Sequence, residues 1–398
     1  MSPIPDATDV FIVGGARTPM TGFVGALKDV SALELGAIAA RGAFDKTGIK
    51  PAWVDHVIIG NVLQTSADAA YGARHVALAA GVPVEVPALT VNRLCGSGIQ
   101  AAVSGAQLIQ LGEANIVLTG GVENMSQAPH VLRGLRAGLK MGNVPLEDSL
   151  LEGLRDSYCD CTMAMTAENA AAKYGITRAE QDAYALRSQQ LAARAWAEGR
   201  FSDEIVPVEI QTRKSVEIVH RDDHLRPETT IEKLAKLQPA FTKDGTVTAG
   251  NASGIVDGGA ALILASAAAI DRNGVRPLGR LLGWAVCGVE PSLMGMGPAP
   301  ATRAVLKKLK LTLDDVDLIE VNEAFAAQYL AVETDLGLDR NKVNVNGGAI
   351  ALGHPLGMTG TRLLLTLLLE LRRRGRKRGL AAACIGGGQG IAAVVEAI

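Results

Sequence analysis

The sequence predicts an α/β protein in which the strands of a mainly parallel sheet alternate with helices on its faces. Two observations predict this class: short β-branched runs recur between alanine-rich stretches of helical pattern, and motifs of the first half return in the second half. The chain has 398 residues, of which 48% are hydrophobic. That is enough for two or three domains with packed cores.

The individual strands and helices are predicted from these runs. The predicted strands begin at Asp9, Val54, Ala114, Val316 and Gly379. The predicted helices span Ala32–Thr47, Gly98–Leu111, Arg178–Glu198 and Thr359–Arg374. The third helix has a start signal, because Thr177 can be its N-cap and Glu180 stands where a capping box needs a glutamate.

A weak internal repeat relates the two halves of the chain. The segment "FDKTGIKPAWVDHVIIGN" parallels "LKKLKLTLDDVDLIEVN", and Cys95 with its following helix and strand parallels the segment from Gly353. Two such layered halves are expected to place the carboxyl ends of their strands around one crevice. The more charged stretch from about Glu123 to Gly250 interrupts the first half and is predicted to be an inserted, largely exposed domain.

Charge and hydrophobicity argue against several classes of partner. The formal net charge is −2, so small molecules are expected as partners rather than nucleic acid or acidic membrane. No apolar stretch reaches the roughly 18–20 residues of a membrane span. The basic run "LRRRGRKRG" from Leu371 is interpreted as a solvated helix end, with a polyanion site as the alternative.

The expected compartment decides how the cysteines are interpreted. The start "MSPIPDATDV" has two aspartates and no Lys or Arg, so it resembles neither a secretory signal nor a transit peptide, and a cytoplasmic protein is expected. Free thiols are then expected rather than disulfides. The five cysteines are Cys95, Cys159, Cys161, Cys287 and Cys384. No metal site is expected, because Cys159 and Cys161 lack further ligands nearby.

Cys95 stands in "VNRLCGSGIQ", where an extended apolar stretch gives way to small residues and then a helix. Backbone N–H groups at a helix start favour a thiolate, and the glycines after Cys95 would let a substrate carbonyl approach the backbone. A small buried cysteine at a crowded turn explains this segment equally well.

His354 stands in a glycine-rich loop, "NVNGGAIALGHPLGMTG". A loop histidine before a proline suits a general base or an oxyanion donor, although a structural histidine bonded to a backbone carbonyl is the alternative. The glycines do not form a GxxxxGK[ST] or a well-placed GxGxxG motif, so nucleotide triphosphate or dinucleotide binding is not expected.

Two further segments end predicted strands: "VNEAF" with Asn322 and Glu323, and "CIGGGQG" from Cys384. Together with the Cys95 and His354 segments they resemble the thiolase family, which carries a CGSG-type nucleophile turn, an NEAF motif, a GHP motif and a CxG motif in this order. The resemblance extends from "VGGARTP" at Val13 to the end of the chain and includes "MAMTAEN" and "DGTVTAGNASGIVDGGAA".

The resemblance implies the five-layered αβαβα thiolase fold, with two similar halves and a loop domain inserted into the first. It implies an N-terminal half over residues 1–122 and 251–273, an inserted loop domain over 123–250 that contacts coenzyme A, and a C-terminal half over 274–398. It also implies a homodimer or a homotetramer built as a dimer of dimers.

The resemblance also implies an activity: cleavage of 3-ketoacyl-CoA by CoA, or condensation of two acetyl-CoA, with CoA and acyl-CoA as substrates and no permanent cofactor. Cys95 would be the nucleophile that forms an acyl thioester, His354 the base that takes its proton, and Cys384 the donor or acceptor of a proton at the α-carbon. One oxyanion hole would consist of His354 and a water held by Asn322, the other of the N–H groups of Cys95 and Gly386.

Seven further positions correspond to CoA contacts in the family. Ser253 matches a pantetheine contact, and Arg226 and Thr229 match contacts to the adenine nucleotide end. The apolar contacts along the pantetheine arm correspond to Met163, Phe241, Ala249 and Phe325. For each of these the ordinary alternative is a surface charge or a core side chain.

One departure from the family's motifs bears on the length of the acyl chain that the enzyme accepts. Acetoacetyl-specific thiolases usually carry His-Met before the "TAEN" motif, whereas this chain has Thr162 and Met163, which resembles the 3-ketoacyl-CoA thiolases of fatty-acid breakdown, including the mitochondrial type. Two alternatives are a catalytically silent acyl-CoA-binding protein of this fold and a ketoacyl-synthase-type enzyme. The second is disfavoured because that type pairs its cysteine with two histidines, whereas this chain has Asn322 and Cys384.

Overall fold

The computed structural model describes residues 9–398. Residues 1–8 lie outside the described range. The expectation that the first ten residues are not a targeting signal therefore concerns residues that mostly lie outside it.

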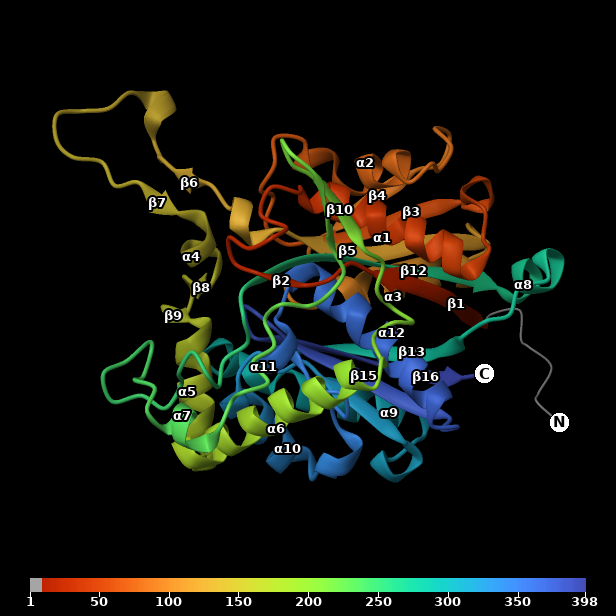
Figure 1. Ribbon diagram of the computed structural model, residues 1–398. Helices are drawn as coiled ribbons and strands as arrows, with labels where there is room; N and C mark the ends of the chain where they lie inside the picture. Colours follow the sequence, from red (N-terminus) through yellow and green to blue (C-terminus); the bar gives the residue numbers. More distant parts are fainter. Residues whose placement is uncertain (1–8) are drawn as a thin grey trace.

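In the described part of the chain, ten strands form one large sheet that extends through both halves of the molecule (Figure 1). Nine of them follow the order β14 (Leu318–Val321), β15 (Arg378–Ile385), β16 (Gln389–Ala397), β13 (Gly279–Gly288), β1 (Val10–Arg17), β12 (Val256–Ser266), β5 (Ile116–Glu123), β3 (His56–Asn61) and β4 (Ala88–Val91). The short strand β2 (Thr21–Gly22) pairs with β12.

The expectation of a mainly parallel sheet is wrong. Within residues 9–398 the parallel pairs of the sheet are β3–β4, β3–β5 and β14–β15, whereas every pair from β15 through β16, β13, β1 and β12 to β5 is antiparallel. The tight glycine turn between β15 and β16 permits only an antiparallel pair, because parallel strands need a long crossover connection. The sheet is therefore mixed.

The internal repeat predicted from the sequence is present in this topology. The first half has the order β4, β3, β5, β12, β1, and the second half has β14, β15, β16, β13, with Val343 bridged to β14 at the position that β4 occupies beside β3. The two half-sheets meet where β1 pairs with β13 through three residue pairs. The two halves therefore share one strand order and the same pattern of parallel and antiparallel pairs.

Helices make the other three of five layers. α1 (Ala32–Thr47) and α2 (Gly72–Ala79) pack on the outer face of the first half, and α9 (Pro298–Leu309) and α10 (Ala326–Leu336) pack on the outer face of the second. Between the half-sheets lie α3 (Ser97–Gln110) and α12 (Leu356–Arg373), which are seen in the middle of Figure 1. The expected five-layered fold is thus observed.

The central helices touch backbone to backbone. A Cβ on Gly98 would lie 2.4 Å from the Thr361 nitrogen, and a Cβ on Gly360 would lie 2.4 Å from the Ile99 nitrogen. Only glycine fits at both positions, so this crossing fixes the distance between the starts of α3 and α12.

The four predicted helices are present as α1, α3, α6 (Arg178–Ala197) and α12. The bounds of α1 are those expected, and the capping box at the start of α6 is formed by Thr177 and Glu180. α12 begins three residues earlier than expected, at Leu356, because Pro355 has backbone angles that suit an N-cap.

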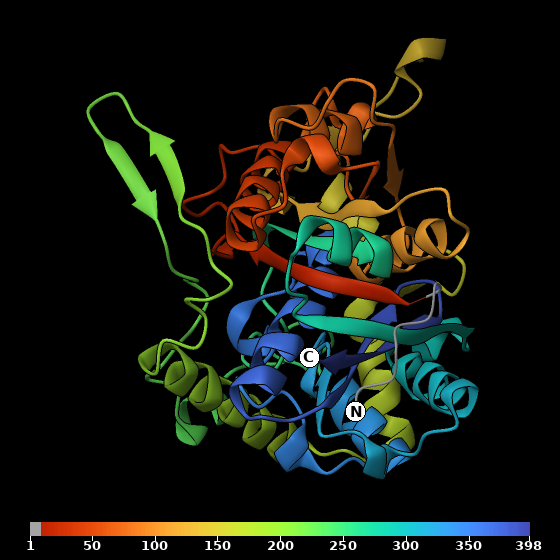
Figure 2. The same ribbon diagram turned by 90° about the vertical axis from the view of Figure 1, so that its right-hand side faces the viewer.

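Most of the remaining α-helices and strands in residues 9–398 are short, and the longest of them has 12 residues. In the insertion they are β6 (His130–Val131), β7 (Glu147–Asp148), α4 (Ser149–Gly153), β8 (Arg155–Asp156), β9 (Cys161–Thr162), α5 (Met163–Tyr174), β10 (Val208–Gln211), β11 (Val216–Val219) and α7 (Ile231–Ala235), and beyond it α8 (Ala267–Asn273) and α11 (Ala349–Leu352). The β6–β7 arm extends from the body in Figure 1, and the β10–β11 hairpin does so in Figure 2.

A buried ion-pair network ties the insertion to β1. The Arg17 guanidinium donates to the Glu204 carboxylate at 2.6 Å and to both oxygens of Asp222 at 2.7 and 2.9 Å. All three side chains are at most 1% exposed. Asp222 precedes the segment that carries Arg226 and Thr229, so this network positions that segment on the body of the fold.

Candidate active site

Cys95 lies in a tight turn between β4 and α3. Leu94 has a φ of +47°, in the left-handed region that residues other than glycine rarely adopt. The Ser97 hydroxyl stabilises this turn, since it accepts from the Arg93 N–H at 2.9 Å and donates to the Leu94 carbonyl at 2.7 Å. The strained turn presents Cys95 at the start of α3, as the sequence predicts.

The surroundings of Cys95 keep it a neutral thiol at rest. Burial raises the pKa of Cys95 to about 11, although the N–H groups of Gly386 and of Cys95 itself act in the opposite direction. These two N–H groups are the predicted oxyanion donors, and both are directed at the sulfur. A thiol with this pKa needs a base before it can attack a carbonyl.

Cys384 lies at the end of β15 and is fully buried among Met294, Ala324 and the partly buried Met163 and Phe325. Burial, and then the neighbouring Cys95, raise the pKa of Cys384 well above its usual range. The structure therefore brings the two distant cysteines of the prediction together. Gly386 follows Cys384, and a Cβ there would lie 3.1 Å from the Leu94 side chain.

The hydrogen bonds around His354 determine its tautomer. Its Nδ1 lies 2.6 Å from the Thr359 hydroxyl, and that hydroxyl donates its single proton to the Pro355 carbonyl at 2.9 Å. With that proton committed to the carbonyl, Thr359 accepts from Nδ1, and the ring proton is assigned to Nδ1. The Nε2 atom is then unprotonated and lies 3.2 Å from Nδ2 of Asn322.

His354 is neutral at physiological pH. Burial, and then the positive charge of Arg362, lower its pKa to about 3. A neutral imidazole with a free Nε2 is the form of histidine that accepts a proton. Asn322, fully buried beside it, has an Oδ1 atom without a hydrogen-bond partner among the described residues, so it can hold a further donor such as water.

Part of the predicted CoA contact set lines one cavity of ≈600 Å³. Arg226, Thr229 and Ala249 are among its lining residues, as is His224, which the sequence analysis did not select. The His224 ring packs on Gly254, where a Cβ would lie 2.3 Å from it, and Gly254 accepts from the backbone N–H of His354 at 2.9 Å. Gly254 thus connects the cavity to the proposed base.

The other predicted contacts are placed differently. Ser253 donates its backbone N–H to Ala324 at 3.0 Å, and Ala252 is bridged to Phe325, so this segment runs beside the NEAF loop. Met163 lies near Gly386, 3.6 Å from the position of a Cβ there. Phe241 is not among the residues that line the cavity and is 50% exposed, so the structure does not group it with the others.

Two buried glutamates beside these loops were not assigned a role from sequence. Glu323 accepts from Tyr184 and Ser188, both at 2.7 Å, and from Asn344 at 3.0 Å, which fixes the NEAF loop. Glu123 accepts four N–H groups near Cys95. In the sequence, each is recognisable only as a glutamate at the end of a predicted strand. That position does not show which groups will donate hydrogen bonds to it.

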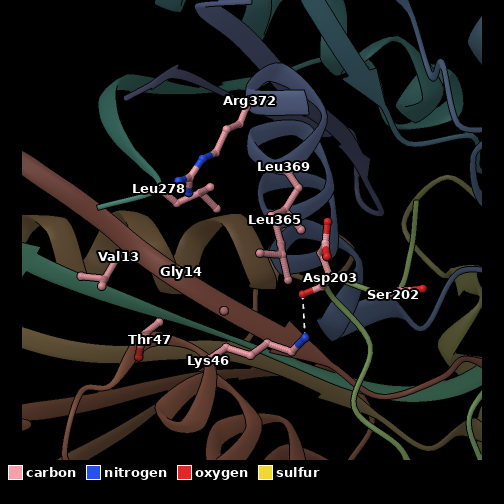
Figure 3. A pocket seen from close by; sticks show the side chains of 11 residues that line it. Val13, Gly14, Lys46, Thr47, Ser202, Asp203, Leu278, Leu365, Leu369 and Arg372 are labelled. Carbon is pink, nitrogen blue, oxygen red and sulfur yellow. Dashed lines mark hydrogen bonds between the residues drawn. The ribbon is translucent and has the colours of Figure 1, made fainter. Parts of the chain in front are cut away.

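A separate cavity of ≈330 Å³ lies between β1 and α12, and its lining residues include no predicted site residue (Figure 3). Lys46 reaches across it to the carbonyl of Asp203 at 2.7 Å. In residues 9–398 no cluster of three or more His, Cys, Asp or Glu side chains is suited to a metal ion, and none of the helices there could span a bilayer.

Comparison with known proteins gives matches over nearly the whole chain. Residues 10–268 match the family described as "Thiolase, N-terminal domain", and residues 275–397 match "Thiolase, C-terminal domain". The human mitochondrial 3-ketoacyl-CoA thiolase is 54% identical over 97% of this chain and 98% of its own length. An acetyl-CoA acetyltransferase of Chromobacterium violaceum is 51% identical over 98% and 99%.

The fold matches solved structures equally well. A crystal structure of human mitochondrial 3-ketoacyl-CoA thiolase in complex with CoA has a TM-score of 0.96 and 53% sequence identity, and the match covers 98% of each chain.

The comparison overturns the expected cytoplasmic location, because the human relative is named a mitochondrial enzyme. The expectation rested on the composition of ten residues at the start of the chain. That composition carries no information about the compartment in which the folded enzyme works.

Proposed function

Because the chain belongs to the thiolase family, we propose that it catalyses the reversible thiolysis of 3-ketoacyl-CoA to acetyl-CoA and a shortened acyl-CoA. The reverse reaction joins two acetyl-CoA into acetoacetyl-CoA. The observation that best supports the proposal is the hydrogen-bonded pair of Thr359 and His354, because it makes His354 a neutral base in a protein whose Cys95 and Cys384 thiols lie close enough to interact.

In the first half-reaction, the sulfur of Cys95 attacks the 3-keto carbonyl and Nε2 of His354 takes the thiol proton. The bond between C2 and C3 then breaks, and its electron pair leaves as the enolate of acetyl-CoA. Cys384 gives its proton to that carbon. Its raised pKa supports this role, because the thiol remains protonated until a strongly basic carbanion is formed.

In the second half-reaction, the thiolate of Cys384 takes the proton of an incoming CoA thiol. The CoA sulfur attacks the acyl group on Cys95, and Cys95 leaves and regains its proton from His354. Each proton is thus returned to its starting group. Oxyanions that develop on the way are stabilised by His354 with a water held at Asn322, and by the N–H groups of Cys95 and Gly386.

CoA is proposed to bind along the insertion. Arg226 and Thr229 in the large cavity would contact the adenine nucleotide end, and Ser253 the pantetheine arm, with Ala249, Met163 and Phe325 as apolar neighbours. The human relative in the solved complex binds CoA. We propose the same three domains as the family resemblance implies. The N-terminal half is residues 1–122 with 251–273, the inserted loop domain is residues 123–250, and the C-terminal half is residues 274–398.

For the substrate we propose 3-ketoacyl-CoA of more than one chain length, rather than acetoacetyl-CoA alone. Thr162, at the position where acetoacetyl-specific enzymes carry histidine, supports this. We expect initial rates of thiolysis with medium-chain substrates to be at least comparable to the rate with acetoacetyl-CoA. Activity on acetoacetyl-CoA alone would contradict the broader substrate range.

We propose a homodimer that pairs into a homotetramer. The unpaired edge of β4, with Leu89 exposed, and the β6–β7 arm, with Leu135, Leu139 and Met141 exposed, support contacts between copies. Light scattering of the purified protein measures the number of subunits.

Replacing Cys384 with alanine is expected to lower the rate of carbon–carbon bond cleavage and formation by about 10²–10⁴-fold. Acylation of Cys95 by acetyl-CoA should persist, because His354 and the Cys95 turn are unchanged. Mass spectrometry of the Cys95 peptide detects the acyl group, and a coupled assay measures the rate. Near-normal synthesis by this variant would refute the proton-transfer role, and an unmodified Cys95 in folded wild-type enzyme would favour a silent acyl-CoA-binding protein.

A further inference from the structure

Glu123 is a buried carboxylate beside the active site that the mechanism above does not use. It ends β5 and is 0% exposed. Its oxygens accept from Nδ2 of Asn61 at 3.1 Å, and from the backbone N–H groups of Val62 at 3.2 Å, Leu63 at 2.9 Å and Gly357 at 2.8 Å. All four donors are uncharged, so the carboxylate is solvated by the protein but not neutralised.

These donors come from both halves of the molecule. Asn61, Val62 and Leu63 follow β3, whereas Gly357 lies in the first turn of α12, directly after His354 and Pro355. The N-cap of α12 provides no side-chain hydrogen bond. Glu123 therefore caps α12 from the other half, where an anion also interacts favourably with the helix dipole.

The same segment and the nucleophile pack against one apolar cluster. Val62 and Leu63 pack in one apolar cluster with Cys95 and with Leu356, the first residue of α12. The ionisable groups whose charges act on this region are Cys95, Asp257 of β12 and, beside Cys95, Cys384 of β15. Burial raises the pKa of Glu123 itself to about 7, so the carboxylate carries its negative charge above that pH, where Cys95 titrates.

We propose that Glu123 is a positioning residue of the reaction. Its carboxylate holds the first turn of α12, and with it His354, against the segment beside Cys95, and its charge adds to the effect of burial in keeping the resting Cys95 protonated until His354 takes the proton. This inference rests on the proposed thiolase function for its effect on turnover, but its effect on Cys95 does not depend on turnover.

The test compares wild type with Glu123→Gln in two measurements. The first is the alkylation of Cys95 by iodoacetamide from about pH 7 to about pH 11.5, a range that includes the wild-type midpoint, followed by mass spectrometry of the Cys95 peptide. Loss of the charge should lower the midpoint pH, so that alkylation at about pH 8 becomes roughly threefold to tenfold faster. The second is thiolysis, in which kcat should fall about 10- to 100-fold with little change in the KM for CoA, because the base is misplaced.

Two further variants separate charge from position. Glu123→Asp keeps the charge on a shorter side chain, so it should retain the wild-type alkylation midpoint and still lower kcat. Glu168→Gln is the matched control, since Glu168 on α5 also accepts two backbone N–H groups, from Thr246 and Val247 at 2.8 Å, and should not shift the midpoint.

The outcomes are distinct. An unchanged midpoint in folded Glu123→Gln overturns the proposal, because a merely structural carboxylate would lower kcat without changing the titration of Cys95. An unchanged kcat in Glu123→Gln, or in Glu123→Asp if the glutamine variant does not fold, overturns the positioning role. Wild-type protein without turnover on any 3-ketoacyl-CoA would refute the proposed function instead, and the alkylation measurement would still test Glu123.

Discussion

Cys95→Ala is expected to lower thiolysis by at least about 10⁴-fold, the largest effect on activity of any single substitution in this protein. The methyl group cannot attack a carbonyl, and the only other thiol at the site, Cys384, lies on the side where the enolate is protonated. The donors at Gly386 and residue 95 remain, so substrate binding should persist while bond formation is lost. Initial rates and the acyl mass on residue 95 measure both effects.

The matched control for this substitution is Cys287→Ala. Cys287 is a partly buried cysteine of β13, paired with Gly390 in the sheet and assigned no part in the reaction. The Cys287→Ala enzyme should keep a turnover rate within about twofold of wild type, as expected of a substitution away from the site. A Cys95→Ala enzyme that kept more than about one hundredth of the wild-type rate would show that the acyl group passes through another residue.

Arg17→Met is expected to have the largest effect on stability and to lower the free energy of unfolding by about 3–5 kcal/mol. The substitution removes the cation and leaves Glu204 and Asp222 buried without it. Burial acts to lower the pKa of Arg17, but the two carboxylates outweigh burial and raise it. Chemical denaturation followed by tryptophan fluorescence measures the loss.

A combined variant tests whether the charge is the cause. Arg17→Met together with Asp222→Asn and Glu204→Gln removes the unpaired anions, so it should be more stable than Arg17→Met alone. A loss below about 1 kcal/mol for Arg17→Met would mean that water or other groups already solvate the carboxylates. Because Asp222 precedes the cavity segment, the single variant should also raise the KM for CoA.

The sequence predicted those features that depend on local pattern. The ends of α1 and α6, the capping box at Thr177 and the turn of Cys95 are each encoded by neighbouring residues, and the structure has them. The internal repeat was visible in the sequence because both halves have the same order of helix and strand. Strand direction is not encoded locally, and the mainly parallel sheet was therefore predicted wrongly.

The parts that could not be predicted depend on contacts between distant segments. Gly357 and Glu123 are 234 positions apart, and no sequence pattern near Glu123 predicts that a backbone N–H group of a helix in the other half donates to its carboxylate. The tautomer of His354 needs the geometry of the Thr359 hydroxyl, although Thr359 was already within a predicted helix. Phe241 was assigned by its match to a family position, but its side chain lies at the surface.

The glycine crossing of α3 and α12 also limits how this enzyme can move. With Gly98 and Gly360 in backbone contact, the nucleophile and the base are carried by what is mechanically one rigid body. Hinge closure of two lobes, by which many two-domain enzymes exclude solvent, is incompatible with that joint. Any gating motion during a catalytic cycle must therefore leave this crossing intact and come from segments outside it.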